Sequence, residues 1–121
     1  MTVIHGVVID CADAQELSGF WQAVLGWEFR MREPDWCSLR NPAGGPHLSF
    51  QQVPEGKVVK NRVHLDIRPE TGDLEAERNR IEALGARSLE FFDKGEWSHW
   101  VMADLEGNEF CILSPEHARA T

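Results

Sequence analysis

The chain has 121 residues, of which 42% are hydrophobic and 26% charged, a composition that suits one compact folded domain over residues 1–121. Its formal net charge of -8 excludes a typical nucleic-acid-binding protein, because such proteins concentrate Lys and Arg on one face. The sequence contains no stretch long and apolar enough for a membrane span and no signal-peptide pattern at its beginning, so we expect a soluble, cytoplasmic protein.

The first half of the chain predicts a strand, a helix and three further strands. Residues 3–10 are rich in β-branched side chains, which favour a strand. Asp13 and Glu16 form an Asp-x-x-Glu capping pattern, and apolar residues at helical spacing then run to Gly26, where a glycine typically ends a helix. The three short strands are predicted over residues 27–31, 36–40 and 47–53, with Pro-rich and Gly-rich turns between them.

A polar connector that begins at Pro54 leads to a second half with the same order of elements. Residues 62–67 alternate polar with apolar side chains, as a strand does, and a helix is predicted from about Asp73 to Gly85. The closing strands are predicted over residues 88–92, 97–102 and 109–113.

Three cysteines are widely spaced along the chain, at Cys11, Cys37 and Cys111. Their number is odd, and none of them forms the CxxC pair that zinc ribbons and redox motifs need. We therefore expect free thiols.

The two halves repeat one motif. In each, a His near the start of the first strand is followed twenty residues later by Leu-Gly at the helix end: His5 with Leu25-Gly26, and His64 with Leu84-Gly85. Such self-similarity predicts two similar βαβββ units, over about residues 3–53 and 62–114. We expect an α+β fold in which both units form a curved, half-barrel mixed sheet around a cavity that the two His face.

Alternation along each strand assigns side chains to one of two faces. In residues 62–67, Val63, Leu65 and Ile67 are expected to cover the helix, whereas Arg62, His64 and Asp66 point the opposite way. By the same alternation, and by the repeat for His5, the other inward-facing residues are His5, His47, Ser49, Gln51, Glu109 and Cys111.

The paired units, with an early His, a Leu-Gly helix end and a closing Asp-Leu-Glu-Gly-Asn-Glu-Phe segment, resemble the vicinal-oxygen-chelate superfamily. That superfamily contains glyoxalase I, extradiol dioxygenases, fosfomycin-modifying enzymes and bleomycin-binding proteins. The resemblance covers roughly residues 3–114, and its most specific pieces are residues 60–66 and 107–111. These pieces look like the glyoxalase-like domain branch.

The resemblance implies a metal site, but this chain differs from the metal-dependent relatives at the two carboxylate positions. In the metal-dependent relatives each unit gives one His and one carboxylate to a divalent ion. Here His5 and His64 are kept, but Ser49 and Cys111 stand at the carboxylate positions. Because Mn, Fe or Ni sites of this type usually need an anionic oxygen, glyoxalase I and dioxygenase activities are disfavoured.

Other ligands could complete the site. A Cys111 thiolate or Asp66 could join the two His, and a set of His, His and Cys suits zinc better than manganese. The alternatives stay open, since a buried free Cys usually behaves as a small hydrophobic residue and the two His could simply be hydrogen-bonded in a cavity wall. The expected cofactor is at most one divalent metal ion, zinc or another.

The candidate residues are grouped by the role that we assign to them. The catalytic candidates are His5, His64 and Asp66, and the metal-ligating candidates are His5, His64 and Cys111. The substrate-binding candidates are Trp36, His47, Ser49, Gln51, Arg62, Trp97, His99 and Glu109. For the aromatic members the alternative is an ordinary core or dimer contact.

Two functions remain open for a protein of this kind, both with a small-molecule ligand. One is a lyase or isomerase that uses His5 and His64 to polarise an oxygen of an organic metabolite. The other is a binding protein that sequesters a drug or metabolite between aromatic walls, as bleomycin-resistance proteins do. A structural or regulatory dimer with an empty cavity is a third class. Relatives of this length commonly pair, so we expect a homodimer with no nucleic-acid or membrane partner.

Overall fold

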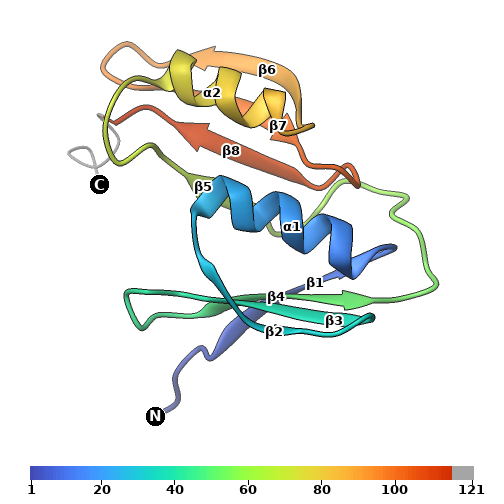
Figure 1. The fold of residues 1–121 in the computed structure, drawn as a ribbon. Helices are drawn as coiled ribbons and strands as arrows, with labels where there is room; N and C mark the ends of the chain where they lie inside the picture. The colour runs from blue at the N-terminus through green and yellow to red at the C-terminus, as the bar shows by residue number, and fades with distance from the viewer. Residues whose placement is uncertain (116–121) are drawn as a thin grey trace. The chain divides into compact units, whose positions relative to one another are not determined.

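The structure is a computed structural model that describes residues 1–115. It contains two compact units, Met1–Lys57 and a second that begins at Val58. Each unit has the order strand, helix, three strands, so the predicted α+β class and the predicted pair of βαβββ units are confirmed (Figure 1). Neither described helix has the length and apolar character that a membrane crossing requires.

The first unit is a four-stranded mixed sheet with one helix. Its strands lie in the order β1-β4-β3-β2, with β1 parallel to β4 and the other pairs antiparallel. The elements are β1 (Gly6–Cys11), α1 (Ala14–Leu25), β2 (Glu28–Arg32), β3 (Trp36–Arg40) and β4 (His47–Gln52).

The second unit repeats this arrangement. Its strands lie in the order β5-β8-β7-β6, and here the parallel pair is β5 with β8. The elements are β5 (Leu65–Ile67), α2 (Leu74–Ala83), β6 (Arg87–Asp93), β7 (Ser98–Ala103) and β8 (Glu109–Leu113).

Both helices begin where their local sequence predicts. The Asp13 side chain accepts a hydrogen bond from the Glu16 backbone N–H at 3.0 Å, and the Asp73 side chain accepts one from Ala76 at 2.7 Å. α1 then ends at Gly26, whose φ of 70° lies in the left-handed region that glycine adopts without strain.

Each sheet has a helix face, which its helix covers, and a far face on the opposite side. In the first unit Arg32, which pairs with Cys37 across the sheet, reaches Gln15 of α1 through a 3.1 Å hydrogen bond. This contact assigns the Cys37 side of the sheet to the helix. The buried helix-face residues are Cys37, Leu39, Leu48 and Phe50, and the far-face residues of β3 and β4 are Trp36, Ser38, His47, Ser49 and Gln51.

In the second unit, Trp100 identifies the helix face. Its indole Nε1–H donates a hydrogen bond to Glu75 of α2 at 2.8 Å. The Cζ atom of Arg78, also in α2, lies 4.6 Å from the centroid of its ring. The buried residues that share this face are Met102, Phe110 and Ile112. The far face therefore carries Asp66, His99, Val101, Cys111 and Leu113.

Two predicted strands begin later than expected. The strand predicted over residues 3–10 begins at Gly6, since its partner β4 begins at His47, and Val3 and Ile4 are exposed. The strand predicted over residues 62–67 is reduced to Leu65–Ile67, and Val63 is 74% exposed instead of covering the helix. His5 and His64 thus lie immediately before their strands.

Gly85→Ala should lower the stability of the protein. Gly85 has a φ of 119°, and an added Cβ would come within 2.6 Å of Leu105 Cδ2, so we expect a cost of about 1–3 kcal/mol. Urea unfolding should show this as a lower midpoint. Gly19→Ala is the matched control, because Gly19 lies inside α1 with nothing within 4 Å of its added Cβ. It should leave the midpoint unchanged or raise it, and a Gly85→Ala midpoint equal to that of the wild type would contradict this account.

Candidate functional site

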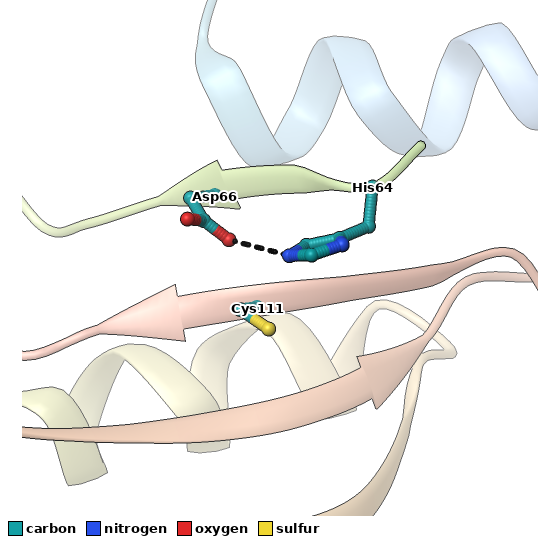
Figure 2. Close-up of side chains that lie close together, drawn as sticks. All are labelled: His64, Asp66 and Cys111. Carbon is teal, nitrogen blue, oxygen red and sulfur yellow. Dashed lines mark ion pairs between the residues drawn. The ribbon is translucent and has the colours of Figure 1, made fainter. Parts of the chain in front are cut away.

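Three potential metal ligands of different chemistry meet in the second unit. The donor atoms of His64, Asp66 and Cys111 all lie within 4.8 Å of one another. His64 Nε2 is 3.2 Å from Asp66 Oδ1, and Figure 2 shows these two side chains facing each other above the Cys111 sulfur. An imidazole, a carboxylate and a thiol therefore converge on one point.

Strand register brings these residues together. Asp66 in β5 is the direct parallel partner of Cys111 in β8, so their side chains stand on the same face. His64 lies two residues before Asp66, and its side chain extends to the same side (Figure 2). Cys111 is nearly buried, whereas the His64 and Asp66 side chains are 44% and 52% exposed. The site thus has one fixed member and two that solvent can reach.

The segment before β8 is fixed by a buried carboxylate. Asp104 Oδ1 accepts hydrogen bonds from the backbone N–H groups of Glu106 and Asn108, at 2.9 and 3.0 Å. Gly107, with a φ of 84°, completes the turn. The Asp-Leu-Glu-Gly-Asn motif in the sequence therefore determines where β8, and with it Cys111, begins.

Glu109 fixes the approach to β5. Its Oε1 accepts a hydrogen bond from the backbone N–H of Asn61 at 2.9 Å, and the Asn61 side chain donates to Asn108 Oδ1 at 3.2 Å. These bonds tie the residues that precede His64 to the start of β8. The assignment of Glu109 as a substrate-binding residue stays a prediction; in the structure its carboxylate holds the backbone at Asn61.

The surroundings of Cys111 favour the protonated thiol. Burial, followed by the negative charge of Asp66 and a hydrogen bond to it, raises the pKa of Cys111 to about 11, against a smaller opposite effect of Lys60. Without a bound cation, Cys111 is therefore an unreactive thiol at neutral pH.

The corresponding position in the first unit lacks this chemistry. Val8 of β1 is the parallel partner of Ser49 in β4, on the far face, as Asp66 is the partner of Cys111. Ser49 and Cys111 are thus equivalent, but by this match the counterpart of His64 is Gly6. By strand register the predicted equivalence of His5 and His64 is therefore displaced by one residue, and both His lie just before their strands.

The predicted residues of the first unit gather on its far face. The His5 and His47 rings lie edge to face with centroids 5.3 Å apart, and Trp36 is the cross-strand partner of Gln51. Ser49 Oγ is 2.8 Å from Ser38 Oγ. The assignment of His5 as a metal ligand and catalytic residue stays a prediction.

Among the remaining predicted residues, His99 lies on the far face of the second unit, and Arg62 is exposed in the bend before β5. The His99 ring stacks on the Phe92 ring, with the ring centroids 5.0 Å apart and an interplanar angle of 14°. Trp97 precedes β7 and is half-buried. The strand partner of Cys111 in β7 is Val101, so His99 is a diagonal neighbour of Cys111, at roughly 7–8 Å between Cα atoms.

Sequence analysis missed three residues that belong to these surfaces: Arg30, Ser38 and Phe92. Ser38 was detectable, because it shares the period-two phase of Trp36 on one predicted strand. Arg30 lies at a register shift between Phe29 and Met31, and a similar shift between Ser88 and Glu90 precedes Phe92. Such bulges change the face of every later residue and have no clear mark in the sequence.

The sequence profile of the Glyoxalase-like domain family matches residues 6–113. The chain belongs to this family. The match confirms the predicted resemblance to the vicinal-oxygen-chelate superfamily and its glyoxalase-like branch. No curated protein sequence matches the chain.

Solved structures of the superfamily share the fold of this glyoxalase-like chain. A glyoxalase/bleomycin resistance protein/dioxygenase family enzyme from Burkholderia phytofirmans is 21% identical, with a TM-score of 0.76 over 93% of this chain and 98% of its own. A lactoylglutathione lyase from Agrobacterium tumefaciens is 13% identical, with a TM-score of 0.67 over 93% of each chain. The oxidase ChaP-H2 is 15% identical, with a TM-score of 0.65 over 93% of this chain and 94% of its own. At these identities the likeness shows the fold alone.

Asp66→Asn should make Cys111 more reactive in metal-free protein. The substitution removes a negative charge that raises the pKa of the thiol, so a larger fraction is ionised at pH 8. We expect alkylation of Cys111 to accelerate roughly threefold or more, while burial still keeps it slower than a free thiol. Site-resolved mass spectrometry separates Cys111 from the buried Cys11 and Cys37. Asp10→Asn is the control, and equal Cys111 rates in the two variants would refute this explanation.

Proposed function

We propose that this chain is an enzyme that acts on a small organic metabolite, a lyase or isomerase of the glyoxalase-like type. The observation that carries the proposal is the convergence of His64, Asp66 and Cys111 on the far face of the second unit. Family membership and a structural neighbour named lactoylglutathione lyase support the reaction class. A small-molecule ligand, a homodimer and a cytoplasmic location remain predictions that accompany it.

The donor set fits a divalent ion of the zinc type. In tetrahedral zinc sites, bond lengths of about 2.0–2.3 Å place ligand atoms roughly 3.3–3.7 Å apart. The 3.2 Å separation of His64 Nε2 and Asp66 Oδ1 is close to that edge, and the exposed side chains can rotate to bring the remaining atoms nearer. Nitrogen, oxygen and sulfur donors together suit zinc better than magnesium or manganese.

His64, Asp66 and Cys111 would hold the ion with three protein ligands, the number found in catalytic zinc sites with an open position. When bound, such an ion supplies Lewis-acid polarisation of a substrate oxygen. The exposure of His64 and Asp66 leaves the site accessible to substrate. The Phe92 and His99 rings, which stack on each other on the same face, provide an aromatic wall against which a substrate can be oriented.

Metal binding tests the proposal directly. Untagged protein, stripped of metal and reconstituted, should bind close to one equivalent of zinc by elemental mass spectrometry. With cobalt it should show a thiolate-to-cobalt charge-transfer band. Cys111→Ala should abolish that band, and His64→Ala should weaken binding at least about tenfold. Affinity should increase with pH, because the Cys111 thiol must lose its proton to coordinate.

His47→Ala is the control, since His47 belongs to the first unit and is not one of the three donor residues. It should bind metal as the wild type does. His5→Ala in the same series tests whether His5 adds a further ligand, as the resemblance implies. Wild-type protein that takes up no zinc or cobalt would exclude the metal-assisted form of the proposal.

A non-catalytic binding protein of the bleomycin-resistance type is the second candidate. The observation that favours it is the parallel Phe92 and His99 pair, whose ring faces suit a planar ligand. On this hypothesis the aromatic surface would contribute more to affinity than the three polar residues. The two candidates therefore differ in which substitutions matter.

Phe92→Leu separates the two candidates. For any ligand found by thermal-shift screening, a binding protein should lose roughly tenfold or more in affinity with Phe92→Leu and little with His64→Ala, as isothermal titration calorimetry would measure. Phe91→Leu is the matched control, because Phe91 pairs with Trp100 on the helix face. The opposite ranking, with His64→Ala the more damaging, would count against the binding protein.

A further inference from the structure

The far face of the first unit carries an arginine that the proposed function does not use. Arg30 lies at the bulge between Phe29 and Met31 of β2. Its Nη1 donates a hydrogen bond to Ser38 Oγ at 3.0 Å. Ser38 Oγ lies 2.8 Å from Ser49 Oγ, and both serines are buried, at 0% and 4% exposure. Ser38, itself in contact with Ser49, thus engages one N–H group of the guanidinium.

No carboxylate forms an ion pair with Arg30 within residues 1–115. Arg30 is nevertheless half-buried, and a guanidinium removed from water is usually paired with an anion. Its remaining N–H groups form a planar fork that matches the two oxygens of a carboxylate or a phosphate. Among the described residues, Arg30 therefore has N–H groups that suit an anion and no carboxylate paired with them.

Three cationic groups act on His47 of this face, which also carries the carboxylate of Asp10, the strand partner of Gln51. Burial, followed by the positive charges of Arg30, His5 and Arg40, lowers the pKa of His47. His47 Nδ1 accepts a hydrogen bond from the Asn41 backbone N–H at 3.3 Å, so in the neutral ring the proton is on Nε2, which is a donor. The groups that act on His47 are cationic, as an anion site requires.

We propose that the far face of the first unit binds a small oxyanion, the carboxylate or phosphate group of a small molecule, with Arg30 as its main ligand. Ser38 and Ser49 position the guanidinium, while His47 and Gln51, on the same face as Ser49, supply further donors. The site shares no residue with His64, Asp66 and Cys111, so it stands whether or not a metal binds in the second unit.

Titration of metal-free, ¹⁵N-labelled protein with an oxyanion tests the site. The Arg30 Nε–H resonance should shift saturably with acetate, with inorganic phosphate or with both, and chloride at equal ionic strength should leave it unmoved. Saturation by acetate alone assigns the site to carboxylates, by phosphate alone to phosphates, and by both to oxyanions in general. A linear drift with every salt would overturn the proposal.

Arg30→Gln and Arg32→Gln form the matched pair of variants. Arg32 lies on the same strand but on the helix face. Its guanidinium donates a hydrogen bond to Gln15 and lies over the Phe29 ring, with Cζ 4.5 Å from the ring centroid. Arg32→Gln should retain the affinity for the probe anion, whereas Arg30→Gln should weaken it about tenfold or more, and Arg30→Lys should restore it only in part. Equal losses in both Gln variants would overturn the proposal. Because the wild-type titration reads Arg30 itself, it decides the question even if Arg30→Gln does not fold.

Discussion

The register of the parallel pair β5 and β8 is the constraint on which the candidate site depends. It makes Asp66 the direct partner of Cys111 and places His64, two residues earlier, on the same side. The register is itself held at its beginning, where Asp104 closes the turn before β8 and Glu109 ties down the backbone at Asn61. These residues contribute no donor atom to the cluster, yet they determine where its donors lie.

The same constraint explains why two units of one topology carry different chemistry. A strand alternates its side chains between two faces, so every second partnership of a parallel strand pair lies on the far face. In the second unit this partnership is Asp66 with Cys111. At the equivalent position of the first unit it is Val8 with Ser49, and Asp10 with Gln51 follows on the same face. In the first unit the polar contacts instead continue across β3 to β2. Ser49 Oγ lies beside Ser38 Oγ, and Arg30 donates a hydrogen bond to Ser38 Oγ. The same scaffold thus carries both the residues proposed to bind a cation and the residues proposed to bind an anion.

How much the sequence predicts depends on how local the determining interaction is. The beginnings of both helices follow from Asp13 and Asp73, because each cap involves residues three positions apart. The starts of β1 and β5 depend on where a partner strand distant in the sequence begins, so both were predicted too early. The face of Arg30 depends on a bulge, and the contact between His64 and Asp66 depends on side-chain rotation, neither of which periodicity encodes. Ser49 and Cys111 lie inside regular strands, and both are found on the far face of their sheets, as alternation predicts.

Burial divides the candidate site in a way that suits ligand exchange. Cys111 is held at 9% exposure by the sheet, and this burial is also the main reason why its thiol keeps its proton. His64 and Asp66 are about half exposed, and each can turn away from the other at the cost of one solvent-screened contact, worth roughly 1 kcal/mol or less. A rigid sulfur with two adjustable partners can close around a cation or open toward a substrate without rearranging the strands. A fully buried cluster would lack that freedom, because every rotation would leave a polar group without a partner.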